Sequence, residues 1–438
     1  MKKLRDIKNG ELYYNGYNLT NLAKEYGTPL KITFLDVISE HISSLKASFD
    51  AAINKVGYKG KFCYLNANKA NYGANEIETA FIEGDGLETS SYYDLLLTLK
   101  IYNKHPEFKN KLIVSNGLKL NDYVDEIVNA HLNGYNIIDI IDDLNEYEYL
   151  KSKNLPIKVG FRVHLSSLYE ADVPDDRFGL LEDEINYILD DIKNTKLVLT
   201  TIHYHQRGFD YEEDKFKENL LKAFNYYLRA SKSYSTVVNF DIGGGMPLPL
   251  EENFNYEEFA IKTLSYLKEL CEDNNLPMPN IIGENGKFSQ KDSTVNIYKV
   301  VGVKNTGKYP WHIINGSLLV ALPEMYALGE PILVTPINNL DKEMQQVRLA
   351  GITCDCDDVF FDRKKGYFEI STESDNYIGL IGTGSYQNSM NGKGGVHHCL
   401  LPEERDLLIY TKDGKEVREI RDELQTIEEV CELIHFNK

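Results

Sequence analysis

FCYLNANKANY, residues 62–72, places a lysine just after a short apolar run. Phe62 to Leu65 are large apolar or aromatic residues, and the chain then becomes small and polar as far as Asn71. This pattern predicts a buried strand that ends shortly before Lys69. Desolvation lowers the pKa of a lysine, and a neutral amine can attack an aldehyde to form a Schiff base. The alternative is that Lys69 is a solvated loop lysine. Only the rest of the chain decides between a nucleophilic lysine and a solvated one.

A unit of apolar strand, turn and amphipathic helix repeats from residue 36 to about residue 290. The predicted strands are KFCYLN (61–66), GLETSS (86–91), LIVSN (112–116), NIIDI (136–140), KVGFRV (158–163), VLTTIHY (198–204), VVNFDI (237–242) and NIIGE (280–284). Eight strands alternating with helices predict an α/β fold, a (β/α)8 TIM barrel over residues 36–290. A doubly wound open sheet shares this alternation, but no glycine-rich dinucleotide fingerprint follows the first strand.

The helical rhythm fades after about residue 290. Strands are predicted at VNIYKVVGVK (295–304), WHIING (311–316), PILVTP (331–336), VRLAGIT (347–353), DVFFD (358–362), GYFEI (366–370) and NYIGLIG (376–382). We expect residues 291–438 to form a β-sandwich or β-barrel domain that residues 1–35 complete.

The composition excludes several classes of partner. The chain of 438 residues carries a net charge of −19, which argues against nucleic acid and against an anionic membrane.

The chain's basic beginning is not followed by an apolar stretch, so no signal peptide is expected. Charged residues and prolines interrupt the most apolar region, Leu318 to Val334, so no membrane span is expected. Six scattered cysteines are typical of reduced thiols in a cytoplasmic enzyme.

Chemically reactive residues come within the predicted barrel strands, toward their carboxyl ends, or just past them. They are Lys69, Glu88, Asn116, Arg162, His205, Gly243 to Gly245, and Glu284. Each residue alone has an ordinary interpretation, such as a structural histidine or a surface ion pair. However, barrel active sites form where the carboxyl ends of the strands meet, so their shared position predicts a site.

The segment DIGGGMP (241–247) follows an apolar strand. Three consecutive glycines allow backbone N–H groups to approach a phosphate closely, although a flexible turn is an equal alternative for this motif alone. A phosphate-bearing cofactor that also requires an amine suggests pyridoxal 5'-phosphate. Such a cofactor needs a carboxylate beside its pyridine nitrogen, and Glu284 is placed for that role.

A second cluster lies in GITCDCDD (351–358) and VHHC (396–399). A zinc site could combine Cys354 and Cys356 with the histidines and Cys399, but this spacing is not a standard zinc motif, so no metal is predicted. The other hypothesis is a thiol acid near a cationic substrate, with Cys354 giving a proton and Asp355 pairing with a distal cation. An ordinary cysteine in a loop of the β domain is the third possibility.

With these motifs the chain resembles pyridoxal-phosphate-dependent decarboxylases of the alanine-racemase-like fold. This family includes the ornithine, diaminopimelate and biosynthetic arginine decarboxylases, and the likeness is greatest to a short bacterial form of the arginine enzymes. It rests on EYGTPLKIT (25–33), GLETSSYYDL (86–95), IVSNGLK (113–119), DIGGGMP (241–247), GITCDCDD (351–358) and GSYQNSMNGKGGVHHCLLP (384–402). These segments follow the family's order across nearly the whole chain.

The resemblance implies a role for each matching residue. Lys69 would hold the cofactor, His205 would stack on its ring, and Glu284 would bind the pyridine nitrogen. Gly243, Gly244 and Gly245, with Tyr386, would hold the phosphate, and Glu88 and Arg162 would order the groups around Lys69. Gly286 and Lys287 would also contact the cofactor. Cys354 would protonate the substrate carbon, and Asp355 with Asn315 would bind the substrate. The resemblance also implies a homodimer whose shared active sites receive Cys354 and Asp355 from the partner subunit.

The expected reaction is decarboxylation of a basic amino acid, with arginine giving agmatine for polyamine biosynthesis. Three positions depart from the family pattern. Glu-Asn-Gly-Lys (284–287) replaces Glu-Pro-Gly-Arg, Gln206-Arg207 replaces Gly-Ser, and Asn315 stands where an aspartate for the substrate's distal cation is common. Ornithine, lysine, diaminopimelate or carboxynorspermidine therefore remain alternative substrates. A decarboxylase-like regulator without catalysis is the alternative of another class.

Overall fold

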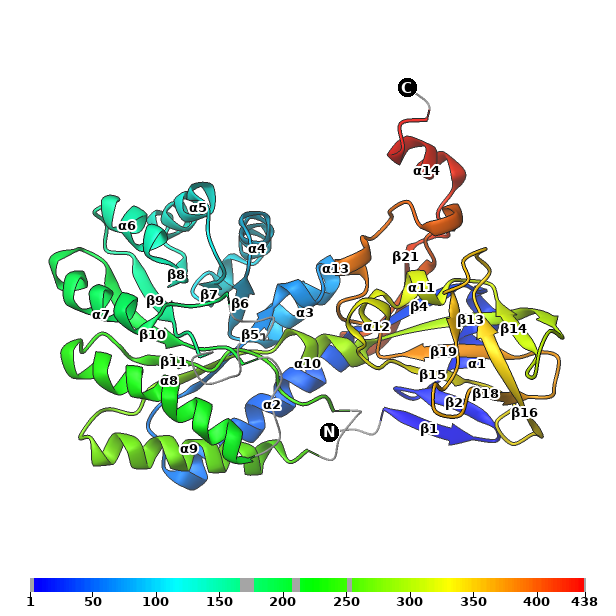
Figure 1. Ribbon diagram of the computed structural model, residues 1–438, viewed down its shortest axis with the longest axis horizontal. Coiled ribbons are helices and arrows are strands. Elements are labelled where there is room, and N and C mark those ends of the chain that lie inside the picture. The colour runs from blue at the N-terminus through cyan, green and yellow to red at the C-terminus, as the bar shows by residue number, and fades with distance from the viewer. Residues whose placement is uncertain (1–3, 166–176, 207–212, 250–253, 437–438) are drawn as a thin grey trace. The chain divides into compact units, whose positions relative to one another are not determined.

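The computed structural model describes residues 4–165, 177–206, 213–249 and 254–436 (Figure 1). Arg207, which the sequence marks as a departure from the family, lies outside these residues. The chain divides into two compact units. One contains His41–Lys69 and Ile77–Phe288, and the other contains Met1–Glu40, Ala70–Glu76 and Ser289–Lys438. We call them the barrel unit and the β-rich unit.

The barrel unit is built on a closed parallel barrel in which each strand pairs with its sequence neighbours and β12 pairs with β5. Its strands are β5 (Phe62–Ala67), β6 (Gly86–Thr89), β7 (Leu112–Ser115), β8 (Asn136–Ile141), β9 (Lys158–Arg162), β10 (Val198–His203), β11 (Asn239–Asp241) and β12 (Asn280–Glu284). The predicted TIM barrel is confirmed. Strands such as NIIDII in β8 are almost fully buried, as expected where helices cover a parallel sheet.

Helices alternate with these strands (Figure 1). They are α2 (Leu35–Val56), α3 (Ala74–Glu83), α4 (Tyr92–Lys104), α5 (Asn121–Leu132), α6 (Leu144–Ser152), α7 (Glu182–Asp191), α8 (Glu213–Ser233), α9 (Tyr256–Asp273) and the short α10 (Gly286–Gln290). Ser91, Asp143 and Asn255 begin α4, α6 and α9 because their side chains accept the backbone N–H three residues later. These caps fix the points at which the loops after the strands turn into helices.

The β-rich unit contains two sheets. β1 (Arg5–Lys8), β2 (Glu11–Tyr14) and β3 (Tyr17–Asn18) form a small antiparallel sheet. The larger mixed sheet contains β4 (Leu30–Phe34), β13 (Thr294–Lys304), β14 (Trp311–Ile314), β15 (Leu333–Pro336), β16 (Met344–Ala350), β17 (Val359–Phe360), β18 (Phe368–Ser371), β19 (Tyr377–Ile381), β20 (Arg405–Lys412) and β21 (Lys415–Asp422). The N-terminal β4 lies between β13 and β20, so an N-terminal strand does complete this sheet.

The β-rich unit also contains elements that the sequence pattern does not indicate. These are the final hairpin β20–β21 and the helices α1 (Leu19–Tyr26), α11 (Leu318–Ala321), α12 (Pro323–Leu328), α13 (Asn388–Asn391) and α14 (Ile427–Leu433). Of the residues that interrupt the apolar region 318–334, Pro323 opens α12, while Glu330 and Pro331 lie in the loop between α12 and β15. Within the described part of the chain, every helix is too short or too polar to cross a lipid bilayer.

Candidate active site

The candidate active site is a group of polar side chains at the carboxyl ends of the barrel strands. Lys69 follows β5 in a single 3-10 turn, Asn68–Ala70, while Glu88 and Glu284 lie within the last two residues of β6 and β12. The turn that carries Lys69 is fixed by Asn68, whose amide donates to Asp94 at 3.0 Å and to Thr98 at 2.9 Å. The barrel topology therefore brings this lysine and these carboxylates to one face, as predicted from their positions in or after the strands.

Two buried carboxylates share one amide donor in this group. Asn116 Nδ2 donates to Glu88 Oε1 at 3.0 Å and to Glu284 Oε1 at 2.8 Å. Lys69 Nζ lies 3.8 Å from Glu88 Oε2, and the lysine side chain keeps 43% of its exposure. An accessible amine thus stands beside a fully buried carboxylate, which is an arrangement suited to a nucleophilic lysine.

The two carboxylates have opposite protonation tendencies. Burial raises the pKa of Glu88 to about 7, although Lys69 opposes the shift and Glu284 adds to it. Burial also acts to raise the pKa of Glu284, but His203 and Lys69 outweigh it and bring that pKa below its usual range. Glu284 is therefore the permanently charged member of the pair.

His205 and the glycine run are in direct contact. His205 Nδ1 accepts the backbone N–H of Gly244 at 3.2 Å, so the glycine run orients the imidazole ring. Burial, together with Lys69 and Arg162, lowers the pKa of His205 to about 3, which leaves the ring neutral with its proton on Nε2. A neutral, fixed imidazole can present its face to an aromatic ring.

The glycine run requires glycine for steric reasons. Gly243 has a φ of 64° and Gly245 a φ of 107°, both in the region that favours glycine. A Cβ on Gly244 would lie 2.3 Å from the carbonyl oxygen of Glu284, and one on Gly243 would lie 2.6 Å from His205 Nδ1. The loop therefore packs tightly against both β12 and His205.

Gly244→Ala is expected to lower the free energy of unfolding by about 1–3 kcal/mol, because the backbone of Glu284 must move to admit the methyl group. The cofactor should also bind more weakly, since the same movement displaces the loop's N–H groups. Thermal unfolding and a cofactor titration measure the two effects. Gly395→Ala is the control, because its new Cβ would meet no atom nearer than 4.0 Å, and it should match the wild type.

The remaining predicted residues of the barrel side lie at two other places. Arg162 ends β9, and its guanidinium lies 4.5 Å from the centre of the Phe178 ring. Gly286 and Lys287 open α10 immediately after Glu284 and Asn285, although Lys287 belongs to a helix of only five residues. Their contact with a cofactor remains a prediction.

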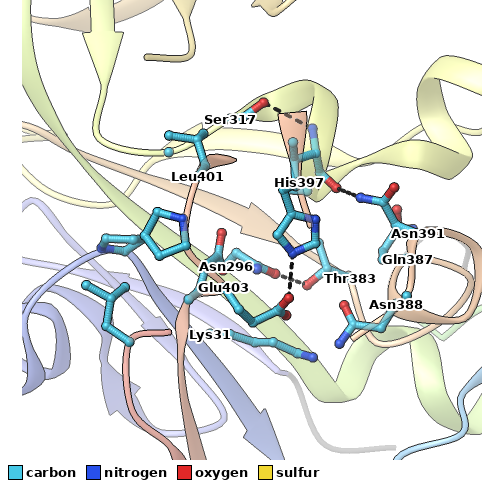
Figure 2. Close-up of a pocket in the computed structure, with 18 of the residues that line it drawn as sticks. Lys31, Asn296, Ser317, Thr383, Gln387, Asn388, Asn391, His397, Leu401 and Glu403 are labelled. Carbon is cyan, nitrogen blue, oxygen red and sulfur yellow. Dashed lines mark hydrogen bonds and ion pairs between the residues drawn. The ribbon is translucent and has the colours of Figure 1, made fainter. Parts of the chain in front are cut away.

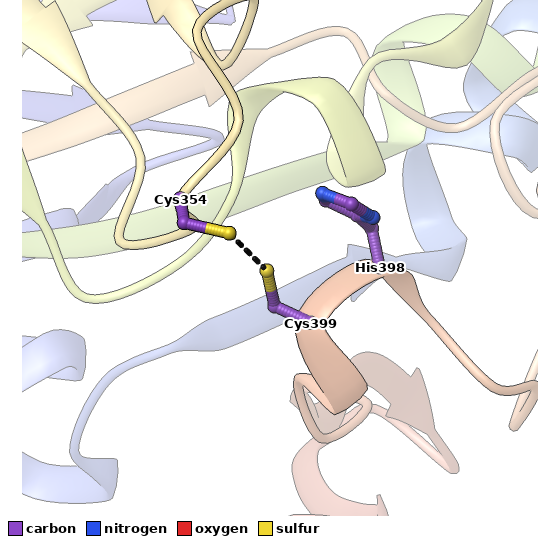
Figure 3. Close-up of side chains that lie close together, drawn as sticks. All are labelled: Cys354, His398 and Cys399. Atoms are coloured by element: carbon purple, nitrogen blue, oxygen red, sulfur yellow. Dashed lines mark hydrogen bonds between the residues drawn. The ribbon is translucent and has the colours of Figure 1, made fainter.

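The β-rich unit holds the predicted acid and substrate residues. Cys354 is exposed, and its Sγ lies 3.5 Å from Cys399 Sγ (Figure 3). This contact with Cys399 raises the pKa of Cys354, which favours the protonated thiol that an acid requires. Asp355 lies with one carboxylate oxygen 3.4 Å from His398 Nε2. Tyr386 has a φ of 56°, and its backbone N–H donates to the carbonyl of Ala70 at 2.8 Å.

A pocket of about 110 Å³ lies within the β-rich unit (Figure 2). Asn315 is one of the residues that line it. Its amide already has structural partners: Nδ2 donates to the carbonyl of Thr28 at 2.9 Å, and Oδ1 accepts the N–H of Lys299 at 2.8 Å. His397 also lines this pocket, where its Nε2 lies 2.6 Å from Glu403. Substrate contact by Asn315 thus remains a prediction. The amide would have to contact the substrate while its oxygen and its nitrogen already make these hydrogen bonds.

The same pocket contains a half-buried residue, Glu404, whose carboxyl group has an unusual pKa. Glu404 receives hydrogen bonds from the Tyr298 hydroxyl and from Asn296 Nδ2, yet burial raises its pKa from 4.5 to about 7. Between these two values the folded chain holds a proton that the unfolded chain has released. Glu404 therefore stabilises the fold fully below pH 4.5, and this contribution is lost as the pH rises to 7.

We expect Glu404→Gln to flatten the pH dependence of stability between pH 4.5 and 7. The wild type should lose roughly 2–3 kcal/mol more than the variant across this window, since one pKa unit is worth about 1.4 kcal/mol. Denaturant unfolding at a series of pH values measures the difference. Glu428→Gln, at an exposed position, is the matched control and should retain the wild-type profile. Identical profiles for wild type and Glu404→Gln would contradict the assignment.

The structure adds two barrel residues that the sequence reading missed. His203 and Asp241 are the final residues of β10 and β11, and both are buried with ligating atoms within 4.8 Å of one another and of Glu284. His203 Nε2 lies 3.6 Å from Glu284 Oε2. The available signal was their polarity at the last position of otherwise apolar strands.

These residues fit pyridoxal phosphate. Among the described residues, the buried atoms Glu88 Oε2, Asp241 Oδ2 and both ring nitrogens of His203 make no hydrogen bond. Buried polar atoms ordinarily have such partners, so these atoms favour a polar ligand at this face. The accessible Lys69 amine, the charged Glu284 and the tight glycine run match the aldehyde, pyridine nitrogen and phosphate of the cofactor. Fold and site together define a class, the TIM-barrel proteins that bind pyridoxal phosphate at their strand ends.

Comparison with known proteins identifies the family. Residues 38–290 match the family described as "Pyridoxal-dependent decarboxylase, pyridoxal binding domain". The chain therefore belongs to the pyridoxal-dependent decarboxylases, and pyridoxal phosphate is its cofactor, as predicted.

Several curated relatives are biosynthetic arginine decarboxylases. The enzyme of Prochlorococcus marinus (strain MIT 9515) is 28% identical over 308 residues, which cover 65% of this chain and 47% of the relative. That of Tolumonas auensis is 23% identical over 373 residues, which cover 80% of this chain and 56% of the relative. The chain thus spans about half the length of the curated relatives it matches.

Solved structures share the fold across nearly the whole chain. The biosynthetic arginine decarboxylase of Campylobacter jejuni matches with a TM-score of 0.85 at 20% identity, covering 99% of this chain and 89% of that one. A diaminopimelate decarboxylase from M. jannaschii matches with a TM-score of 0.79 at 18% identity, covering 98% and 97%. At these identities the likeness shows the architecture, which both kinds of decarboxylase share.

Proposed function

We propose that the protein is a pyridoxal-phosphate-dependent decarboxylase of a basic amino acid, with arginine as the leading substrate and agmatine as its product. The observation that carries this proposal is the group of Lys69, Glu88 and Glu284 at the barrel's strand ends, joined by Asn116. The arginine decarboxylases among the curated relatives support the substrate class.

In this proposal the barrel residues hold the cofactor. Lys69 would hold the cofactor at its aldehyde carbon, and Glu88 would stay beside the lysine and orient it. Glu284 would bind the pyridine nitrogen and favour its protonated form, because the pKa of Glu284 lies well below neutrality. His205 would cover the ring with its neutral imidazole, and Arg162 would order the groups around Lys69. The loop Gly243 to Gly245 would receive the phosphate together with Gly286, Lys287 and Tyr386. In this loop the N–H groups of Gly243 and Gly244 donate to Asp241 Oδ1 and His205 Nδ1, so they would have to exchange these partners for the phosphate. When bound, the cofactor supplies an electron sink for the pair left by departing carbon dioxide.

The proposed acid acts at the substrate's α-carbon. Cys354 would give its thiol proton to this carbon, and Lys69 would release the amine product. Asp355 receives the substrate's distal cation, since a carboxylate pairs well with a guanidinium or an ammonium. We propose that both residues come from the partner subunit of a homodimer, so each site needs both chains.

The identity of the amino acid depends on few contacts. Asn315 has no charge, and its amide is bound to Thr28 and Lys299, so Asp355 would be the main anion facing the distal group. One carboxylate selects a substrate with a strongly cationic side chain less well than two carboxylates do. For this reason ornithine, lysine, diaminopimelate and carboxynorspermidine form the second candidate set.

Carbon dioxide release from each of these amino acids by the cofactor-loaded protein tests the proposal. Turnover is expected to be fastest with arginine. Turnover of another amino acid without arginine would reject arginine and retain the chemistry. Visible absorbance of the bound cofactor with no release from any of the five would reject decarboxylation and favour a regulator that binds the cofactor.

A further inference from the structure

Three possible metal ligands meet on the surface of the β-rich unit. Cys354 Sγ, Cys399 Sγ and a ring nitrogen of His398 lie within 4.8 Å of one another, and all three residues are exposed (Figure 3). They come from two segments separated by more than forty residues, so the fold rather than a local motif assembles them. Two neighbouring residues are not part of this group. Cys356 lies instead with Asp355 and Asp357, and His397 Nε2 is paired with Glu403.

We propose that Cys354, Cys399 and His398 bind a thiophilic divalent cation, with zinc as the ion that their chemistry favours. The sulfur atoms lie 3.5 Å apart, close to the separation of about 3.8 Å that two zinc-bound thiolates adopt in tetrahedral geometry. Two thiolates and an imidazole are a ligand set that zinc prefers. Three protein ligands leave a fourth position for water.

The surroundings of the histidine support this assignment. Asp355 Oδ2 lies 3.4 Å from His398 Nε2, and a carboxylate paired with an imidazole is the usual arrangement around a metal-binding histidine. Asp357 lies in the same loop, where its carboxylate is within 4.8 Å of the Asp355 carboxylate and of Cys356 Sγ. These carboxylates favour a cation at this surface.

The backbone of the second segment is also held in an unusual conformation. Cys399 has a φ of 56° and Leu400 a φ of 51°, although neither is glycine. A left-handed conformation at such residues costs about 1–3 kcal/mol each and is found mainly at ligand and active sites. Here it directs the Cys399 thiol toward Cys354.

Metal binding would control the reaction if Cys354 is its acid. Zinc coordinates a deprotonated thiolate, so a bound ion removes the proton that Cys354 would donate. The inhibition rests on the proposed function, whereas the binding site does not. Zinc is therefore expected both to bind one equivalent per chain and to suppress decarboxylation reversibly.

The test uses reduced, chelator-treated, cofactor-loaded full-length protein titrated with zinc and with cobalt. Cobalt should give the absorbance of a thiolate-bound ion at one equivalent per chain. Cys399→Ser and His398→Ala should each weaken zinc binding by at least ~10-fold. Loss of a residue that only hydrogen-bonds to a ligand already lowers metal affinity by about this factor, and loss of the ligand itself should lower it further. Cys356→Ser and Cys431→Ser are matched cysteine controls and should bind as the wild type does.

The outcomes separate the two claims. Equal zinc affinity in the wild type, Cys399→Ser and His398→Ala would overturn the site, as would the absence of thiolate absorbance with cobalt. A Cys354–Cys399 disulfide formed in air without any metal binding would also overturn it. If decarboxylation is absent altogether, the absorbance titration still decides the site. Zinc bound at these residues with turnover unchanged would overturn the inhibition alone.

Discussion

Lys69→Arg is expected to lower turnover by at least about 10³-fold, because an arginine side chain cannot form the covalent bond that activates the cofactor. The fold should survive, since the Lys69 side chain is 43% exposed and arginine retains the charge that faces Glu88. The visible absorbance of the lysine-bound cofactor should disappear. Borohydride reduction of the wild type, followed by peptide mapping, should place the cofactor on the peptide that contains Lys69.

Lys61→Arg provides the matched control for this change. Lys61 is exposed and immediately precedes β5, so it lies at the opposite end of the same strand. Its replacement should leave turnover, absorbance and the labelled peptide as they are in the wild type. A cofactor attached to any other lysine, or a Lys69→Arg variant that retains wild-type turnover, would remove the central residue of the proposed mechanism.

The barrel could be predicted from the sequence because its signal is local and repeated. Each strand is a short buried run followed by a helix, and for α4, α6 and α9 the polar capping residue, such as Ser91 before α4, is visible in the sequence. The β-rich unit depends on pairings between distant segments, such as β4 with β20, and these leave no periodic trace. Similarly, no local pattern indicates that Ala70–Glu76, directly after Lys69, groups with the β-rich unit.

The candidate site was predictable only where position in the fold implied chemistry. Glu88 and Glu284 follow from the rule that barrel strands end at the site. Their different protonation states do not follow from it, because these depend on Asn116, His203 and burial in three dimensions. The approach of Cys399 to Cys354 likewise requires the fold, since the spacing of the two segments does not match any standard metal motif.

Lys119, after β7, forms a buried ion cluster with Asp139 of β8 and Glu146 of α6. Lys119 Nζ lies 3.0 Å from Asp139 Oδ1 and 2.9 Å from Glu146 Oε1, and all three side chains are essentially inaccessible. Lys119 also donates to the carbonyl of Ile140 at 2.7 Å. Burial alone would lower the pKa of Lys119, but the two carboxylates outweigh it and raise that pKa, so the ammonium stays charged.

Lys119→Met should lower the free energy of unfolding by roughly 3–5 kcal/mol, because it leaves two buried carboxylates without their cation. Thermal unfolding gives the overall loss. Hydrogen exchange of β8 should show the largest local effect, since Asp139 and Ile140 belong to that strand. Lys100→Met, at an exposed position on α4, removes the same charge and should change stability by less than about 0.5 kcal/mol.

The double variant Lys119→Met with Asp139→Asn decides whether charge is the cause. Removing one of the stranded carboxylates reduces the uncompensated charge, so the double variant should be more stable than Lys119→Met alone. A coupling of this sign is expected when two residues interact directly. If instead the stability losses of the two single variants simply add, the loss in Lys119→Met comes from packing, and the charge interaction between Lys119 and Asp139 does not stabilise the barrel.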